Sequence, residues 1–230
     1  MTDYTRYAVY FAPDADSALA RFGAAWLGWD VEARAAVAHP DLTGLPRSVD
    51  EITSRPRKYG FHGTLKPPLV LAPGKSPGEF ETAVAGLAGT LAPIAGIPFA
   101  LRRLGSFLAL VPARPSGALR DLAAACVQRL DAFRAPPSEA ELAKRRQHTL
   151  SPRQAALLAQ WGYPYVLDEF RFHLTLSGPL AEAEAEMISG VLARHLDPIL
   201  AAPLPVREIC LFGEALDGKF HLLRRFPLGG

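Results

Sequence analysis

Two copies of one five-residue pattern constrain this chain more than any other feature. The first copy is Phe61-His62-Gly63-Thr64-Leu65, and the second is Phe172-His173-Leu174-Thr175-Leu176. Because a β-strand points successive side chains to opposite faces, each His would share a face with its Thr, while Phe and Leu share the other face. Each copy therefore predicts a strand with one apolar face for the core and one His/Thr face for a ligand.

The residues around the second copy continue the alternation. From Phe170 to Ser177 apolar and polar residues alternate without a break, which is typical of a half-buried strand. Arg171 falls on the side of His173. The sequence thus predicts a strand over residues 170–177 that brings a cation to the His/Thr face.

The first copy has a similar neighbourhood. Residues 58–66 are expected to form the strand, and Lys66 shares a face with His62 by the same parity. Pro67 and Pro68 follow, and they are expected to end the pairing of this strand because proline donates no backbone hydrogen bond. Lys66 is therefore the expected counterpart of Arg171.

An internal repeat surrounds the two copies. Each motif strand is followed by a Pro-containing turn, a helix, and two strands joined by a Gly-containing turn, and the motif histidines lie 173 − 62 = 111 residues apart in a chain of 230. We expect one bilobal domain over residues 1–230, of the α+β class, with mostly antiparallel sheets that face a central cleft and helices on the outside. The expected helices cover about 14–27, 79–91, 116–133, 138–146, 151–161 and 182–195, and the remaining expected strands cover 7–11, 99–104, 107–111, 206–212 and 220–226.

Composition excludes several classes of protein. With 49% hydrophobic and 21% charged residues the chain resembles an ordinary globular domain, and a net charge of +2 is too small for a dedicated nucleic-acid binder. Cys126 and Cys210 have no metal-ligand spacing and are expected to be buried thiols. We find no signal-like start and no apolar run of about 20 residues, so a cytoplasmic protein without a membrane partner is expected.

The other histidines and two tyrosines are weaker candidates for a functional site. None of the remaining four histidines is followed by Thr at the second position or has the spacing of a metal motif. Tyr163 and Tyr165 could stack on a base or a sugar, although packing in the core is the favoured interpretation.

These residues resemble the 2H phosphoesterase superfamily, which is defined by two His-x-Thr/Ser motifs on a duplicated α+β scaffold. The resemblance covers essentially the whole chain, and both motifs match it. The stretches Lys58-Tyr59-Gly60-Phe61-His62-Gly63-Thr64-Leu65-Lys66-Pro67-Pro68 and Trp161-Gly162-Tyr163-Pro164-Tyr165 further resemble a bacterial branch that is encoded near carbon–phosphorus lyase genes and is associated with phosphonate metabolism.

The resemblance implies a mechanism and a set of site residues. His62 and His173 would be the catalytic acid and base, with the order of the two left open, and Thr64 and Thr175 would donate hydrogen bonds to phosphate oxygens. No metal and no cofactor are expected. By strand parity, Lys66 and Arg171 are expected to help bind the phosphate electrostatically.

Three functions remain open at this point. The leading hypothesis is a metal-independent phosphodiesterase, expected to be a monomer, that opens a small cyclic phosphate such as a ribose cyclic phosphate. The second is processing of RNA ends with 2′,3′-cyclic phosphates or 2′–5′ linkages, which the modest charge does not favour. The third is a non-catalytic module that binds a nucleotide or RNA. Whether residues 135–153 fold over the cleft is also left open.

Overall fold

The computed structural model describes residues 4–138 and 150–230. The helix expected over 138–146 therefore lies outside the described residues, except for its first position. So does the central part of the segment 135–153.

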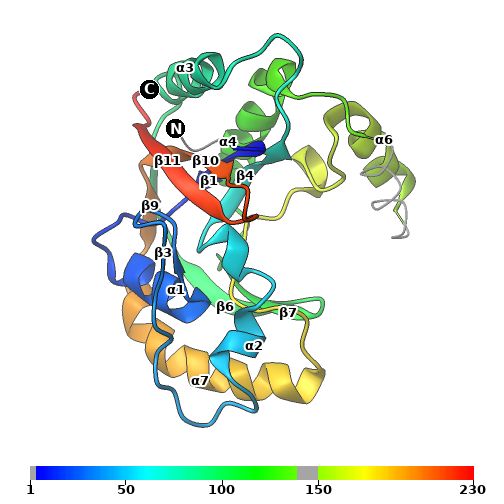
Figure 1. The fold of residues 1–230 in the computed structure, drawn as a ribbon. Helices are drawn as coiled ribbons and strands as arrows, with labels where there is room; N and C mark the ends of the chain where they lie inside the picture. Colours follow the sequence, from blue (N-terminus) through cyan, green and yellow to red (C-terminus); the bar gives the residue numbers. More distant parts are fainter. Residues whose placement is uncertain (1–3, 139–149) are drawn as a thin grey trace.

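A seven-stranded sheet forms the centre of the protein (Figure 1). Its strand order is β11-β10-β1-β4-β8-β7-β6, and every pairing in it is antiparallel. Two small two-stranded sheets, β2-β3 and β5-β9, flank it. The strands of the large sheet are β1 (Arg6–Phe11), β4 (Gly63–Leu69), β6 (Phe99–Leu104), β7 (Phe107–Pro112), β8 (Leu174–Thr175), β10 (Glu208–Glu214) and β11 (Phe220–Pro227), and the small ones are β2 (Trp29–Asp30), β3 (Ala35–Ala36), β5 (Ile94–Ile97) and β9 (Leu204–Val206).

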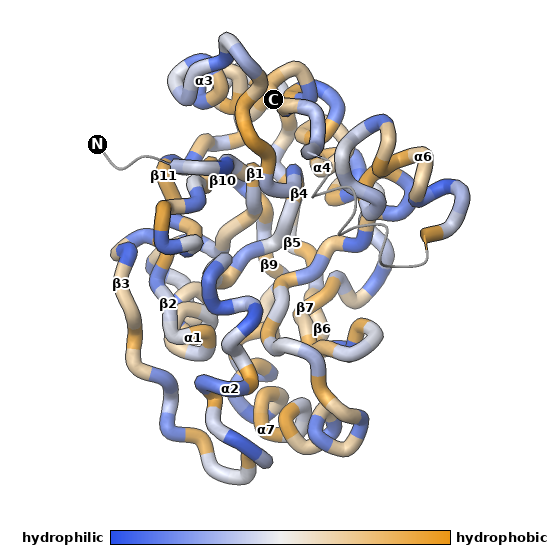
Figure 2. Tube along the Cα trace, turned by 45° about the vertical axis from the view of Figure 1, so that its right-hand side comes forward, coloured by the Kyte–Doolittle hydropathy of each residue, from blue (hydrophilic) through white to orange (hydrophobic). Residues whose placement is uncertain are grey.

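Two of the helices begin with a serine cap and a proline. Ser76 and Ser151 each cap a helix in a capping box that is followed directly by proline, a residue preorganised for the first helical position. Hydropathy alternates along the longest helix, α7, which is the pattern of a helix with one buried face (Figure 2). The helices are α1 (Ala18–Leu27), α2 (Val49–Thr53), α3 (Pro77–Ala88), α4 (Gly117–Arg129), α6 (Pro152–Trp161) and α7 (Glu182–Leu200), and the 3₁₀ turns are η1 (Arg57–Tyr59), η2 (Asp131–Phe133) and η3 (Leu167–Glu169).

Helices cover one face of the large sheet. The buried faces of α1, α3, α4 and α7 join one main hydrophobic cluster with the inward side chains of the strands. The apolar residues of both motifs belong to this cluster, as the alternation predicts. Those residues are Phe61, Leu65, Phe172, Leu174 and Leu176. The expected α+β class, with mostly antiparallel strands and helices outside, is therefore confirmed.

The two motif strands are neighbours in this sheet. Gly63 of β4 pairs with Leu174 of β8, and this single pairing joins the half that contains β1, β10 and β11 to the half that contains β6 and β7. The arrangement differs in this detail from the expected separate facing sheets. Because the motifs lie edge to edge, their His/Thr faces form one continuous surface.

The motif strands also differ from the expected ranges. β8 is only two residues long, and the residues before it form the turn η3 and a stretch without regular secondary structure. β4 starts at Gly63 and runs through Pro67 and Pro68, which were expected to end it. These prolines are tolerated because β8 pairs with β4 at Gly63 alone, and because the pairing of β4 with β1 is irregular along this stretch.

None of the helices within residues 4–138 and 150–230 combines the length and the apolar character that crossing a bilayer requires.

Gly63 offers a test of the junction between the two halves. A Cβ added at Gly63 would lie 2.4 Å from the ring of Phe172, so Gly63→Ala should lower the free energy of unfolding by about 1–3 kcal/mol through overpacking. Chemical denaturation measures this, and Phe172→Leu in the same chain should recover part of the loss. Gly86→Ala in α3 is the matched control, because nothing lies within 4 Å of its added Cβ. Equal effects of the two glycine variants would contradict the close contact.

Candidate active site

The pairing of Gly63 with Leu174 determines how the four motif side chains are arranged. One position away from that pair in each direction, Thr64 comes to lie opposite His173, and His62 opposite Thr175. All four point away from the helix-covered face, because their neighbours in the sequence fill the core. The two histidines are diagonal neighbours, whose Cβ atoms are typically about 7–8 Å apart on adjacent strands. One phosphate can bridge that separation.

Gly60 fixes the ring of His62. The His62 Nδ1 atom lies 2.9 Å from the carbonyl oxygen of Gly60. Gly60 has φ of +69° and ψ of −179°, a region that only glycine adopts readily, and a Cβ there would meet Val31 at 2.0 Å. Any other residue at this position would disturb the backbone that presents this carbonyl to His62.

His173 is held in the same way. Its Nδ1 atom lies 2.7 Å from the carbonyl oxygen of Arg171, again two residues earlier in the chain. A carbonyl can only accept a hydrogen bond, so Nδ1 carries the proton in both rings. The Nε2 atoms of both histidines are therefore the ones that can take up or release a proton, and the Nε2 atom of His62 lies 3.2 Å from the hydroxyl oxygen of Thr64.

Burial keeps His62 neutral. The pKa of His62 is lowered to about 4, first because burial penalises the imidazolium and also because His173 is nearby, while the bond to Gly60 opposes the shift. The ring of Tyr10 stacks on His62 with 3.9 Å between ring centres, and Tyr10 is itself buried. We infer that Tyr10 supplies much of the apolar surface that excludes water from His62.

His173 has a pKa that is shifted in the same direction. Burial lowers the pKa of His173 below its ordinary value, and the hydrogen bond to the carbonyl of Arg171 opposes this. Its ring lies 5.7 Å from that of Phe107, centre to centre. Both histidines are thus predominantly neutral at pH 7, and a bound anion would favour their protonated forms.

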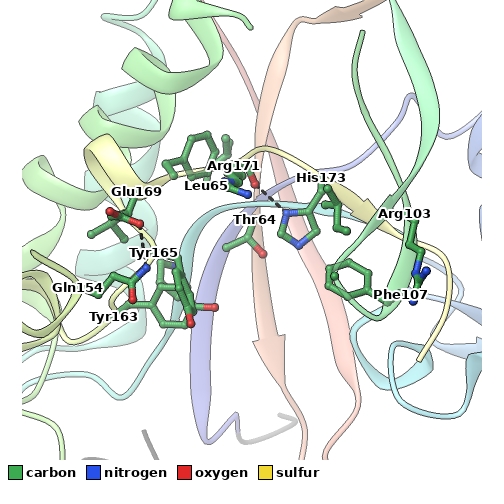
Figure 3. A pocket seen from close by; sticks show the side chains of 15 residues that line it. Thr64, Leu65, Arg103, Phe107, Gln154, Tyr163, Tyr165, Glu169, Arg171 and His173 are labelled. Carbon is green, nitrogen blue, oxygen red and sulfur yellow. Dashed lines mark hydrogen bonds between the residues drawn. The ribbon is translucent and has the colours of Figure 1, made fainter. Parts of the chain in front are cut away.

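A cavity of about 510 Å³ opens beside these residues (Figure 3). His173 and Thr64 lie on its wall, and His62, which directly precedes β4, contacts Thr64. Figure 3 shows that different side chains lie to either side of His173 and Thr64. One side holds Arg103 and Phe107, and the other holds Gln154, Glu169, Tyr163 and Tyr165.

Lys66 does not reach this cavity, although the alternation of side chains along the strand predicted that it would share a face with His62. The strand β4 has a bulge, since Tyr10 pairs with Thr64 but Val9 pairs with Lys66, which leaves Leu65 as an extra residue. The bulge shifts the alternation by one position and turns Lys66 toward the core. There its Nζ donates to the carbonyl of Val127 at 3.0 Å, and burial lowers its pKa to about 8. An ion pair with Asp131 at 3.5 Å compensates part of the burial.

Arg171 does line the cavity, as expected from parity. It is exposed, and its backbone carbonyl also positions His173. Tyr163 and Tyr165 line the cavity too, so the favoured interpretation of core packing was wrong for Tyr165, which is half-exposed. Tyr163 lines the cavity and also packs against a small hydrophobic cluster that contains Val166.

Sequence reasoning missed several residues of this site. Tyr10 gave no signal beyond its place on an apolar strand, and its role depends on the pairing of β1 with β4. Glu169 and Gln154 come from different elements with no shared motif. Arg103 and Phe107 flank the Gly105 turn, which predicted a hairpin and nothing about a cavity.

Metal ligands do not gather at this site. Across the part of the chain that the structure describes, no three His, Cys, Asp or Glu side chains are arranged to hold a metal ion. Cys126 and Cys210 are both buried, and burial raises the pKa of each thiol to about 12.

Comparison with known protein families identifies relatives of this arrangement. The family model described as "Protein of unknown function (DUF1045)" matches residues 64–221, which include the second motif and part of the first. The chain belongs to this family. The resemblance to the 2H phosphoesterases is consistent with the geometry. The two His-x-Thr motifs of this α+β fold meet where β4 pairs with β8, and their polar side chains lie on a common face.

Two curated relatives of the DUF1045 chain carry the same name. The chain is 36% identical over 232 residues to the ribose 1,5-bisphosphate phosphokinase PhnN of Janthinobacterium sp. (strain Marseille), in a match that covers 98% of this chain and 51% of that protein. It is also 36% identical over 220 residues to the protein of that name from Laribacter hongkongensis (strain HLHK9), covering 95% and 51%. The chain thus spans about half the length of the curated relatives it matches.

Solved structures with a similar outline are more distant. E. coli LigT complexed with 3′-AMP is 16% identical, with a TM-score of 0.45 and coverage of 99% of this chain and 100% of LigT. A structure described as a phosphoesterase is also 16% identical, with a TM-score of 0.43 and coverage of 99% and 100%.

The stacking of Tyr10 on His62 generates a prediction about proton affinity. Tyr10→Ala should admit water to the imidazole and raise the pKa of His62 from about 4 toward its ordinary value, because desolvation is the largest cause of the shift. NMR titration of the histidine ring signals measures this. Tyr10→Phe is the matched control, since it keeps the ring and should leave the pKa low. A folded Tyr10→Ala variant with an unchanged pKa would contradict this origin of the shift.

Proposed function

We propose that this chain is a metal-independent phosphodiesterase that opens a small cyclic phosphate by acid–base catalysis with His62 and His173. The observation that carries the proposal is the paired geometry of the two imidazoles. Both donate Nδ1–H to a carbonyl two residues earlier, and this leaves both Nε2 atoms for proton transfer on one surface. Structural histidines in a core have no need of such matched orientation.

The proposed reaction needs two proton transfers. One histidine takes a proton through Nε2 from water as the water oxygen attacks phosphorus. The other donates its Nε2 proton to the ring oxygen as the phosphorus–oxygen bond breaks, and solvent exchange then restores both histidines. Thr64 and Thr175 donate hydroxyl hydrogen bonds to the non-bridging oxygens, and Arg171 supplies positive charge at the cavity wall.

The environments of the two histidines favour one assignment of roles. His62 is the more strongly desolvated and has a pKa of about 4, so it is poised as the neutral base. His173 lies directly on the wall of the cavity, where an anionic phosphodiester favours the imidazolium. We therefore assign the general base to His62 and the general acid to His173.

The proposed substrate is a ribose cyclic phosphate. The resemblance to the branch associated with phosphonate metabolism suggests a sugar phosphate, and the two curated relatives are named for ribose 1,5-bisphosphate. A cavity of about 510 Å³ suits a sugar phosphate or a mononucleotide. We retain processing of RNA ends as an alternative to be separated by assay.

A phosphokinase function is less well supported for this chain. The nucleotide-binding pattern G-x-x-x-x-G-K-[ST] needs a first glycine five residues before the second. Gly74-Lys75-Ser76 matches its end, but Leu69 occupies the place of the first glycine and is buried in the core. We infer that this segment does not form the phosphate-binding loop of such a kinase.

Kinetic variants test the proposal. His62→Ala and His173→Ala should each lower kcat by about 10²–10⁴-fold, because each removes a proton-transfer partner, and the double variant should be little worse than the poorer single variant. In the wild type, kcat/KM should rise as pH increases through about 4, where His62 becomes neutral, and should fall before pH 6.5, where His173 loses its proton. The kcat profile should lie at higher pH because the bound anion raises both pKa values.

The assay should compare a ribose cyclic phosphate, a 2′,3′-cyclic mononucleotide and an RNA with a 2′,3′-cyclic end. His195→Ala is the control variant, because this histidine is exposed on α7 and should not affect turnover. Activity should also persist in EDTA. Turnover that survives the loss of both motif histidines would refute the mechanism, and binding without turnover of all three compounds would favour a binding module.

A further inference from the structure

Glu169 and Gln154 form a hydrogen-bonded pair on the cavity wall. The Gln154 Nε2 atom donates to Glu169 Oε2 at 2.9 Å, and both side chains line the cavity (Figure 3). The backbone N–H of Ser151 donates to the Gln154 Oε1 atom at 3.1 Å, which fixes the amide so that its NH₂ group faces Glu169. The pair therefore has a defined orientation.

The turn that carries Glu169 is held in place from two positions. Both contacts come from the first turn of α6, since Arg153 forms a two-pronged ion pair with Asp168 while Gln154 binds Glu169. Between Val166 and Asp168, Leu167 has φ of +54°, in the left-handed region that side chains such as leucine rarely adopt. Such strain persists only where the surroundings impose it, and it concentrates at ligand sites.

The chemistry of the pair selects hydrogen-bond donors. A carboxylate has two oxygens and about four acceptor sites, of which Gln154 uses one, and the amide has a second N–H. An acidic group also repels a phosphate. A ligand whose phosphate lies at His173 and Thr64 would therefore turn an uncharged end with hydroxyl or amine donors toward Glu169.

The neighbouring aromatic rings favour a sugar over a flat base. Tyr163 and Tyr165 lie beside the pair with ring centres 5.7 Å apart and planes at 76°. Two parallel rings would form a slot for a nucleobase, whereas two nearly perpendicular rings form a corner that suits a compact, puckered ring. The carboxylate beside this corner can accept hydrogen bonds from sugar hydroxyls.

We propose that Glu169 and Gln154, with Tyr163 and Tyr165, form a subsite that recognises the free hydroxyl groups of a sugar phosphate. The proposal depends on the proposed function only for the position of the phosphate. Glu169 would then be a specificity-determining residue that takes no part in proton transfer.

Calorimetric binding of stable monophosphates tests the subsite without turnover. Wild-type protein should bind ribose 5-phosphate more tightly than 2-deoxyribose 5-phosphate. Glu169→Gln should weaken binding of ribose 5-phosphate by about 10- to 100-fold, because it replaces hydrogen bonds to a charged acceptor, and should make the two sugars nearly equal. Binding of inorganic phosphate should not weaken. Glu186→Gln, on the exposed side of α7, is the matched control and should change none of these affinities.

Three outcomes would overturn the subsite. The first is an unchanged preference between the two sugars in Glu169→Gln, and the second is an equal loss of affinity for inorganic phosphate. The third is a guanosine 3′-monophosphate affinity that depends on Glu169 when that of ribose 5-phosphate does not, which would assign the pair to a nucleobase. A selective loss of sugar affinity in a protein that hydrolyses no cyclic phosphate would leave the subsite standing and refute the proposed catalysis.

Discussion

The contact between β4 and β8 is the constraint on which the rest of the site depends. A single backbone pairing, Gly63 with Leu174, joins the two halves of the sheet. It is possible because Gly63 has no side chain where the ring of Phe172 lies. A shift of one residue would turn every motif side chain to the opposite face. The packing of the apolar neighbours in the core and the placement of both histidines on the other face of the sheet are therefore enforced together.

The second constraint acts within each motif. An imidazole that donates Nδ1–H to a carbonyl two residues earlier has only Nε2 left for chemistry, and both motifs satisfy this condition. The two carbonyls are presented differently, by a glycine with positive φ in one half and by Arg171, which lies outside regular secondary structure, in the other. The shared result is two proton-transfer atoms on one surface, in environments that lower both pKa values.

Much of this arrangement could be predicted because it depends on local alternation. Because side chains alternate between the two faces of a strand, the sequence places Phe61, Leu65, Phe172 and Leu176 on the core face. The same alternation places Arg171 on the opposite face. Lys66 could not be predicted, because a bulge resets the alternation and depends on pairing with β1, which the motif does not encode. Tyr10 and Glu169 were missed for a related reason, since each reaches the site through contacts between segments that are distant in sequence. Local alternation predicts which face most motif side chains take. The bounds of the two strands and the residues around them depend on tertiary pairing.

Whether both Nε2 atoms act on one phosphate can be measured by ¹⁵N NMR of labelled histidine. Signals of His62 and His173 would be followed during titration with inorganic phosphate, with His195 as an exposed reference. We expect that both Nδ1 atoms stay protonated, and that both Nε2 signals shift toward the protonated form with one shared dissociation constant. A response from only one of the two histidines, or a proton on Nε2 with Nδ1 bare in the free protein, would contradict it.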